Sequence, residues 1–264
     1  MLKLIYSLLL LCSITVVLGQ ENKPKILAFY PTTDSIPVNI LRFYIQFSAP
    51  MQEMNILKHI KLSNEEGKNI SDVFFENQYE LWNENRTEVT LIVDPGRVKL
   101  GLLANNTMGR AFDEGKNYTL TIDSLLLDFN DQKLSESFTK TFVAVKEDRQ
   151  PPDTKLWQLT IPKVNSTEPI SINFKDKIDH ISAQTLIKIF RDKKEITGEI
   201  LLNNQEQIWI FKPQKKWVKG HYQIMVNPKL EDITANSINQ IFDHKPSDFI
   251  QNNNDNYILN FTIQ

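Results

Sequence analysis

The stretch Leu41-Arg42-Phe43-Tyr44-Ile45-Gln46-Phe47 decides the fold class of this chain. Its most apolar residues stand at every second position, and more polar residues stand between them. Because neighbouring residues on a strand point to opposite faces, this period of two predicts a β-strand with one face in a core. The same alternation returns in Ile170–Phe174 and in Tyr257–Ile263, so strands are expected from one end of the chain to the other.

Further runs rich in β-branched and aromatic residues fill the sequence between these three strands. They cover residues 26–30, 89–93, 118–122, 139–145, 208–211 and 222–226. Turn-forming sequences such as Asp94-Pro95-Gly96 and Asn203-Asn204 separate them. Only Gln184–Phe190 could also form a short helix, and its Ile187/Ile189 alternation suits a strand equally well. Many short strands with turns between them predict an all-β protein built from sandwiches or small barrels.

Composition limits the kinds of protein that this chain can be. The 264 residues are 41% hydrophobic, which is enough for two modest domains or one large one. A net charge of −2 argues against a nucleic-acid binder with a broad basic face. The single cysteine, Cys12, allows neither an intramolecular disulfide nor a metal site built from cysteines.

The first residues have the layout of a secretory signal peptide. Lys3 is followed by an apolar stretch, and Val17-Leu18-Gly19 places small or β-branched residues before Gln20. We therefore expect residues 1–19 to be removed after Gly19 and the protein to be exported to the periplasm, the cell surface or the medium. A lipoprotein signal that acylates Cys12 is the less favoured alternative, because Leu11 is bulky where a small residue is wanted. No later apolar run reaches membrane length, so no transmembrane segment is expected after cleavage.

The sequence also contains an internal repeat, in which the same order of strand and turn motifs occurs twice. Phe47 and Phe174 each end an alternating strand, and Gly115 and Gly220 each stand shortly before a strand tyrosine. The first copy carries two extra segments, within 69–85 and within 102–114, where connections tolerate changes of length. The charged, proline-containing joint Lys146–Asp153 lies between the copies. The expected division is therefore 20–148 for the first domain and 149–264 for the second.

A family resemblance rests on particular motifs of both copies. The first copy begins with a short strand at Ile26–Tyr30, Pro31 and Val38, and its next strand ends in Phe47-Ser48-Ala49-Pro50-Met51. The second has an Asp232-Ile233-Thr234-Ala235-Asn236 turn, with a looser counterpart beginning at Asp128. These features resemble the bacterial immunoglobulin-like domain of the S-layer SbsA type. The second copy lacks the Phe-Ser-x-Pro-Met ending, so there the resemblance depends mainly on the internal repeat.

The resemblance implies two tandem immunoglobulin-like sandwiches in a non-enzymatic cell-envelope protein. It implies no catalytic residues and no cofactor, and it implies a partner that is an unidentified protein or glycan of the envelope. The residues themselves add no His-Glu-x-x-His, nucleophile elbow or phosphate-binding glycine loop. An exported hydrolase with an unrecognised pair of carboxylates stays open as an alternative, because 32 acidic residues always offer such pairs.

Two sets of residues could bind a ligand. Oxygen-rich stretches around Asp128, Asp131 and Asp255 are weak candidates for calcium, since aspartate and asparagine are also ordinary turn formers. The two extra segments of the first copy flank one strand and could form an aromatic and basic patch. The patch candidates are Trp82, Arg86, Arg97, Lys99 and Arg110. With Trp82 at its centre the first domain would be a carbohydrate-binding module; otherwise Trp82 packs under its own loop and the basic groups are solvated.

Overall fold

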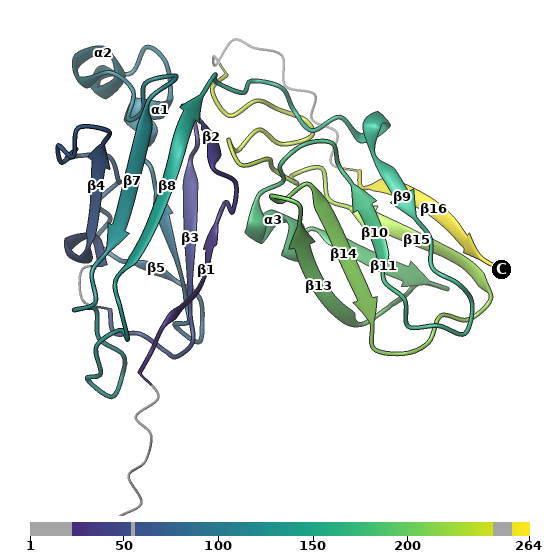
Figure 1. The fold of residues 1–264 in the computed structure, drawn as a ribbon. Coiled ribbons are helices and arrows are strands. Elements are labelled where there is room, and N and C mark those ends of the chain that lie inside the picture. The colour runs from purple at the N-terminus through teal and green to yellow at the C-terminus, as the bar shows by residue number, and fades with distance from the viewer. Residues whose placement is uncertain (1–22, 54–55, 245–254) are drawn as a thin grey trace, which may run out of the picture.

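The computed structural model describes residues 23–53, 56–244 and 255–264, so the expected signal peptide lies outside the described part. The regular secondary structure is mainly β-strand, arranged as four four-stranded sheets (Figure 1). The all-β prediction is therefore confirmed. Among the described residues no helix is long and apolar enough to cross a membrane.

Two sheets face each other in the N-terminal half. One has the order β1-β3-β6-β5 and the other the order β2-β8-β7-β4. All pairs are antiparallel except β2 with β8, which run parallel. The strands are β1 (Ile26–Tyr30), β2 (Ser35–Pro37), β3 (Arg42–Phe47), β4 (Ile60–Asn64), β5 (Leu81–Trp82), β6 (Glu88–Ile92), β7 (Asn117–Ile122) and β8 (Phe138–Val145).

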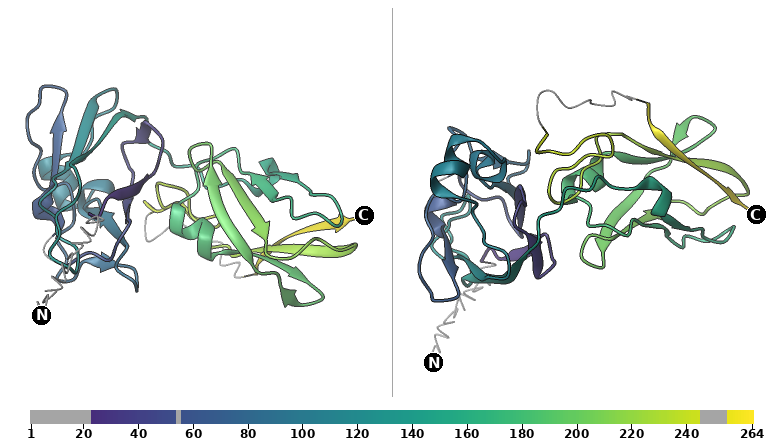
Figure 2. Two further views of the ribbon diagram at one scale, coloured as in Figure 1. Left: turned by 60° about the horizontal axis from the view of Figure 1, so that its bottom comes forward. Right: turned by 90° about the horizontal axis from the view of Figure 1, so that it is seen from above.

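The C-terminal half also consists of two facing sheets (Figure 2). Their orders are β9-β10-β14-β13 and β12-β11-β15-β16, with every pair antiparallel. The strands are β9 (Gln158–Thr160), β10 (Ile170–Asn173), β11 (Ile187–Arg191), β12 (Lys194–Glu195), β13 (Gly198–Asn203), β14 (Ile208–Pro213), β15 (Gly220–Val226) and β16 (Tyr257–Ile263). The order β1-β3-β6-β5 therefore reappears as β9-β10-β14-β13.

Short helices connect some of the strands. Asp94 was expected in a turn with Pro95 and Gly96, but its side chain caps the short helix α1 instead. In the same way Asp179 caps α3, which begins at His180. The turn prediction at Asp94 was wrong, because a capping aspartate and a turn aspartate look alike in sequence. The helices are η1 (Ile56–His59), α1 (Pro95–Val98), α2 (Leu103–Met108), η2 (Thr154–Leu156) and α3 (His180–Thr185).

Each half has its own hydrophobic core. Phe43 and Ile45, from the alternating stretch that opens the sequence argument, are fully buried in the first core. The second core contains Trp209 and Trp217, both fully buried. Burial of large apolar side chains between two facing sheets is the main source of stability in a sandwich.

The halves also share a detail of tyrosine packing. The Tyr118 hydroxyl accepts a hydrogen bond from the Asp113 backbone N–H at 2.8 Å, and the Tyr222 hydroxyl accepts one from the Val218 N–H at 3.3 Å. Each ring also stacks on a phenylalanine of the neighbouring strand, at centroid distances of 5.7 and 5.1 Å. Equivalent contacts at equivalent strands indicate that the two halves are built on one plan.

Candidate functional site

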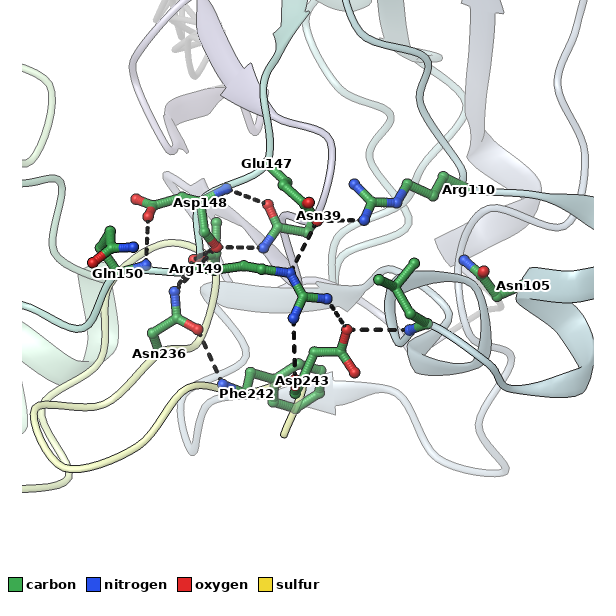
Figure 3. A network of polar contacts seen from close by, with 12 residues as sticks. Asn39, Asn105, Arg110, Glu147, Asp148, Arg149, Gln150, Asn236, Phe242 and Asp243 are labelled. Atoms are coloured by element: carbon green, nitrogen blue, oxygen red, sulfur yellow. Dashed lines mark hydrogen bonds and ion pairs between the residues drawn. The ribbon is translucent and has the colours of Figure 1, made fainter. Parts of the chain in front are cut away.

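The densest polar network of the molecule surrounds the segment that joins the halves (Figure 3). Arg149 of this segment forms ion pairs with Glu147 and with Asp243, which belongs to the C-terminal half. Arg110, in the second extra segment of the first half, also pairs with Glu147. The two arginines hold the pKa of the Glu147 carboxyl below its usual range, mainly through the hydrogen bond from Arg110. These ion pairs connect the loop that carries Arg110 in the first half to the loop that carries Asp243 in the second half.

Residue Asp148 is held from both sides by asparagine side chains. Asn39 of the first half donates to the Asp148 carbonyl at 2.6 Å and accepts from its N–H at 2.9 Å. Asn236 of the second half donates to the same carbonyl at 3.2 Å. The Asn39 side-chain amide pairs with the backbone N–H and carbonyl of Asp148 as a neighbouring strand would. With Asn236 bonded to the same carbonyl, the backbone between the halves is fixed. The joint is partly covered.

The loop that supplies Asn236 is an aspartate-centred turn. The Asp232 carboxylate accepts hydrogen bonds from the backbone N–H groups of Thr234 and Asn236 at 2.7 and 2.9 Å. Ala235 occupies the left-handed region with a φ of 64°, where glycine is usual. Its methyl group packs against the core of the first half. The turn thus serves as part of the contact between the halves.

Three carboxylates meet beside this turn. Single oxygens of Asp148, Asp176 and Asp232 all lie within 4.8 Å of one another, the one such group of three among the described residues. Burial, reinforced by the nearby Asp148 charge, raises the pKa of Asp176 to about 6. Burial and the Asp176 charge raise the pKa of Asp232 well above its usual value. Hard carboxylate oxygens suit a calcium ion chemically, although the Asp232 oxygens are already engaged by its own turn.

A second set of polar contacts joins the halves on the β1–β3 side. Arg42 of β3 pairs with Glu231 at 2.5 Å, and the Tyr44 hydroxyl donates to Asp179 at 2.6 Å. Burial is the largest cause that raises the pKa of Tyr44, and the Asp179 charge adds to it. The ring of His180 stacks on Tyr30 with centroids 3.6 Å apart. Every one of these pairs connects a residue before the joint with one after it.

Two buried polar atoms of this surface have no partner among the described residues. They are His180 Nδ1 and Glu206 Oε2, and both residues line a cavity of about 10 Å³. A space of that size holds at most one water molecule. The cavity therefore belongs to the contact surface and is too small for an organic ligand.

Three of the five patch candidates have structural partners near the joint. Arg97 is buried and donates to the carbonyls of Asp72, Gly109 and Arg110, so its guanidinium holds a loop together. Lys99 lies 4.3 Å from the ring centroid of Phe242 in the second half. Together with the Arg110–Glu147 pair, these contacts occupy the basic groups inside the molecule.

The other two patch candidates lie elsewhere in the first half. Trp82 is partly buried on β5, donates to Glu80 at 2.7 Å and packs on Phe47. Arg86 pairs with Glu53 at 3.5 Å and covers the ring of Phe129. The five residues thus have separate sets of partners, and sequence spacing gave no sign of the loop carbonyls that converge on Arg97.

The calcium candidates also have local partners. Asp128 accepts from the N–H groups of Asn130 and Gln132 at 2.8 and 2.9 Å, and Asp131 accepts from Gln52 at 2.7 Å. Asp255 is exposed just before β16. Most of the asparagine-rich stretch that precedes it lies outside the described residues. Sequence reasoning missed Asp148 and Asp176: Asp176 is brought to Asp232 by pairing inside the second half, and Asp148 reaches them from the joint.

A pocket of about 200 Å³ in the first half is lined by η1, the first extra segment, Leu81 of β5 and strand β6, and Trp82 is not part of its lining. The first extra segment forms its wall, where Phe75, Tyr79 and Leu81 are exposed. Glu76 and Asn77 add polar groups to the lining. Exposed aromatic rings next to hydrogen-bonding side chains are a composition that suits a sugar ring or a partner's side chain.

No protein-family model and no curated protein matches this chain. Solved structures match with low scores. A fragment of Escherichia coli alpha-2-macroglobulin spanning domains MG0-NIE-MG1 has a TM-score of 0.30 at 11% identity and covers 92% of this chain and 72% of its own. The S-layer protein rSbsC(31-844) has a TM-score of 0.31 at 10% identity, covering 92% of this chain and 41% of its own. For a chimeric titin Z1Z2 the score is 0.25 at 12% identity, with 77% and 88% covered.

At these scores the likenesses carry no argument about function. The immunoglobulin-like sandwich is established by the strand orders and the two cores described above. The described residues offer a joint bonded to both halves, a three-carboxylate cluster beside it and, among several surface pockets, one with exposed aromatic rings in its wall.

Proposed function

We propose that this chain is a non-enzymatic, exported module of the bacterial cell envelope. Two immunoglobulin-like domains of the SbsA type, covering 20–148 and 149–264, are held at a fixed angle and act as a rigid spacer that displays loops to an envelope protein or glycan. The single observation that carries the proposal is the joint, where the Asp148 backbone is bonded to both halves. A flexible linker would leave this backbone to solvent.

The extra segments of the first half support a structural role. Leu100 donates its N–H to Asp243 at 3.2 Å, and Arg110 pairs with Glu147 of the joint. Insertions in a sandwich usually lie free in solvent and carry recognition. Here Lys99 and Leu100, just before the second insertion, contact the other half, and Arg110 of the insertion pairs with the joint, so together they resist bending of the joint.

Small-angle X-ray scattering on the full secreted chain tests the rigid spacer. We expect the profile of a single shape, and we expect Arg149→Ala to broaden the distribution of distances because it removes the ion pairs to Glu147 and Asp243. Arg191→Ala is the matched control, since Arg191 pairs with Asp192 and the Lys219 carbonyl inside one half. A wild-type profile that requires many interdomain angles would contradict the proposal.

Export is tested separately by cell fractionation and mass spectrometry of the mature protein. We expect the chain outside the cytoplasm with Gln20 as its first residue. An intact Met1 on a cytoplasmic protein would contradict the exported part of the proposal and leave the rigidity result standing.

A carbohydrate-binding role is the second candidate, and the pocket lined by Phe75, Tyr79 and Leu81 is the observation that favours it. A glycan array with the wild type, Tyr79→Ala and Trp82→Ala tests it. Tyr79 is 71% exposed, so its removal should abolish binding without loss of stability. Binding that neither change affects, or no binding at all, would count against this candidate.

A further inference from the structure

The two halves differ at one sheet edge. In the first half, the outer edge of β8 is covered by β2, which pairs in parallel with Val143–Val145. In the second half, β16 takes the place of β8 but is the terminal strand of its sheet. Among the described residues no strand pairs with its outer side, and Figure 1 shows it at the rim of the molecule, away from the first half.

The two strands correspond position by position. Phe138–Val145 and Tyr257–Ile263 share the same alternation of burial, and Phe142 and Phe261 each stack on the tyrosine of the adjacent strand. In this alignment Leu259 of β16 corresponds to Lys140 of β8, and Ile258 corresponds to Thr139. The comparison therefore shows which protective residues β8 has and β16 lacks.

The edge of β8 is protected in the manner of natural sheet edges. The Lys140 ammonium donates to the Thr32 carbonyl at 2.8 Å and to Asp34 at 2.5 Å, which places a charge beside the edge. Pro37 in β2 has no N–H to offer a further strand. An edge lysine and an edge proline are two of the known devices against unwanted strand pairing.

The strand β16 has neither device. Its seven residues, Tyr257–Ile263, include no charge and no proline, and Ile258 is 48% exposed. The backbone groups on its outer side form a template for another strand. A neutral strand that meets its own copy antiparallel brings no like charges together, so its sequence is compatible with itself.

We propose that β16 pairs antiparallel with β16 of a second copy of this chain, about a two-fold axis near Asn260. The two C-terminal sheets then form one continuous sheet, and Leu259 of each copy lies opposite Phe261 of the other. The contact is small and leaves the joint and both cores unchanged. We expect a weak dimer, because strand-edge contacts bury less surface than stable dimers do.

Sedimentation velocity over a concentration series, with the full secreted chain, tests the dimer. We expect the wild type to associate reversibly and Asn260→Lys to raise the dimer dissociation constant about tenfold or more, because two added charges face each other at the axis. Asn260 is exposed, so this change should leave folding intact. Leu259→Lys places a lysine at the position that corresponds to Lys140 of β8, and it should also raise the dimer dissociation constant.

Gln223→Lys is the matched control. Gln223 lies on β15 opposite Asn260 and bonds to it at 3.1 Å, so the same charge is added to the same face one strand away from the edge. We expect its dissociation constant to stay near that of the wild type. A wild type that remains monomeric at every concentration would overturn the proposal. So would a dimer that Asn260→Lys and Gln223→Lys weaken equally.

A disulfide tests the register, in a chain whose own Cys12 is replaced by serine. Residues that face each other in an antiparallel pair have Cα atoms about 4.5–5.5 Å apart, which a disulfide can bridge. Asn260→Cys should therefore give a covalent dimer under mild oxidation, whereas Gln223→Cys should not. Equal crosslinking of both variants, or of neither, would overturn pairing about Asn260.

Discussion

The aspartate turns of the two halves have the same hydrogen bonds in different surroundings. Asp128 accepts from the N–H groups two and four residues later, and so does Asp232. The third residue after each aspartate has a positive φ, 59° at Asp131 and 64° at Ala235. The first turn leaves its next residues exposed, whereas the second is buried against the other half. One local structure is thus a solvent loop in one copy and a docking element in the other.

Removing each aspartate tests this comparison most strongly. We expect Asp232→Ala to lower the free energy of unfolding by about 3 kcal/mol, because it leaves several buried donors without an acceptor. For Asp128→Ala we expect about 1 kcal/mol, since water can reach the donors that it frees. Chemical denaturation at pH 7 measures both. Equal losses would show that burial does not distinguish the turns.

The residue after each aspartate gives a smaller effect. Ile233 is 7% exposed, while Phe129 in the same place of the first turn is 55% exposed. Ile233→Ala should therefore lower the free energy of unfolding by about 2 kcal/mol and Phe129→Ala by less than about 0.5 kcal/mol. Thermal unfolding monitored by circular dichroism distinguishes these values. A Phe129 effect as large as that of Ile233 would contradict the exposed position of the first turn.

The pH dependence sharpens the comparison further, because the second turn lies beside Asp176, whose pKa is raised. In the folded protein Asp176 has a pKa of about 6, above the ordinary 3.8, so between these values the folded state holds the proton more tightly. Its contribution to stability is therefore present at low pH and is lost as the pH rises through 6. We expect Asp176→Asn to raise the stability at pH 7 relative to the wild type by about 1–2 kcal/mol.

Measuring both proteins from pH 4 to pH 8 checks the sign. The difference between Asp176→Asn and the wild type should grow as the pH rises and level off above pH 7. Asp131→Asn in the first turn is measured in parallel as the control. A difference that shrinks with rising pH would contradict the raised pKa.

The strands could be predicted from the sequence, because alternation such as that of Phe43, Ile45 and Phe47 reports burial directly. The aspartate turn at 232–236 was also visible as a motif. Its burial was not, because that depends on contacts with residues of the first half far away in the chain. The same reason explains the patch hypothesis: Arg97 is basic in sequence, yet its partners are three loop carbonyls that only the folded chain brings together.

The clamped joint has a consequence for proteolysis. Lys146 and Arg149 are trypsin sites in a segment that the sequence marks as a linker, and a protease must draw several residues of extended chain into its cleft to cut there. As long as Asn39 and Asn236 hold Asp148, this stretch is a poor substrate. The rate of cutting at Arg149 therefore reports how often the two sandwiches separate.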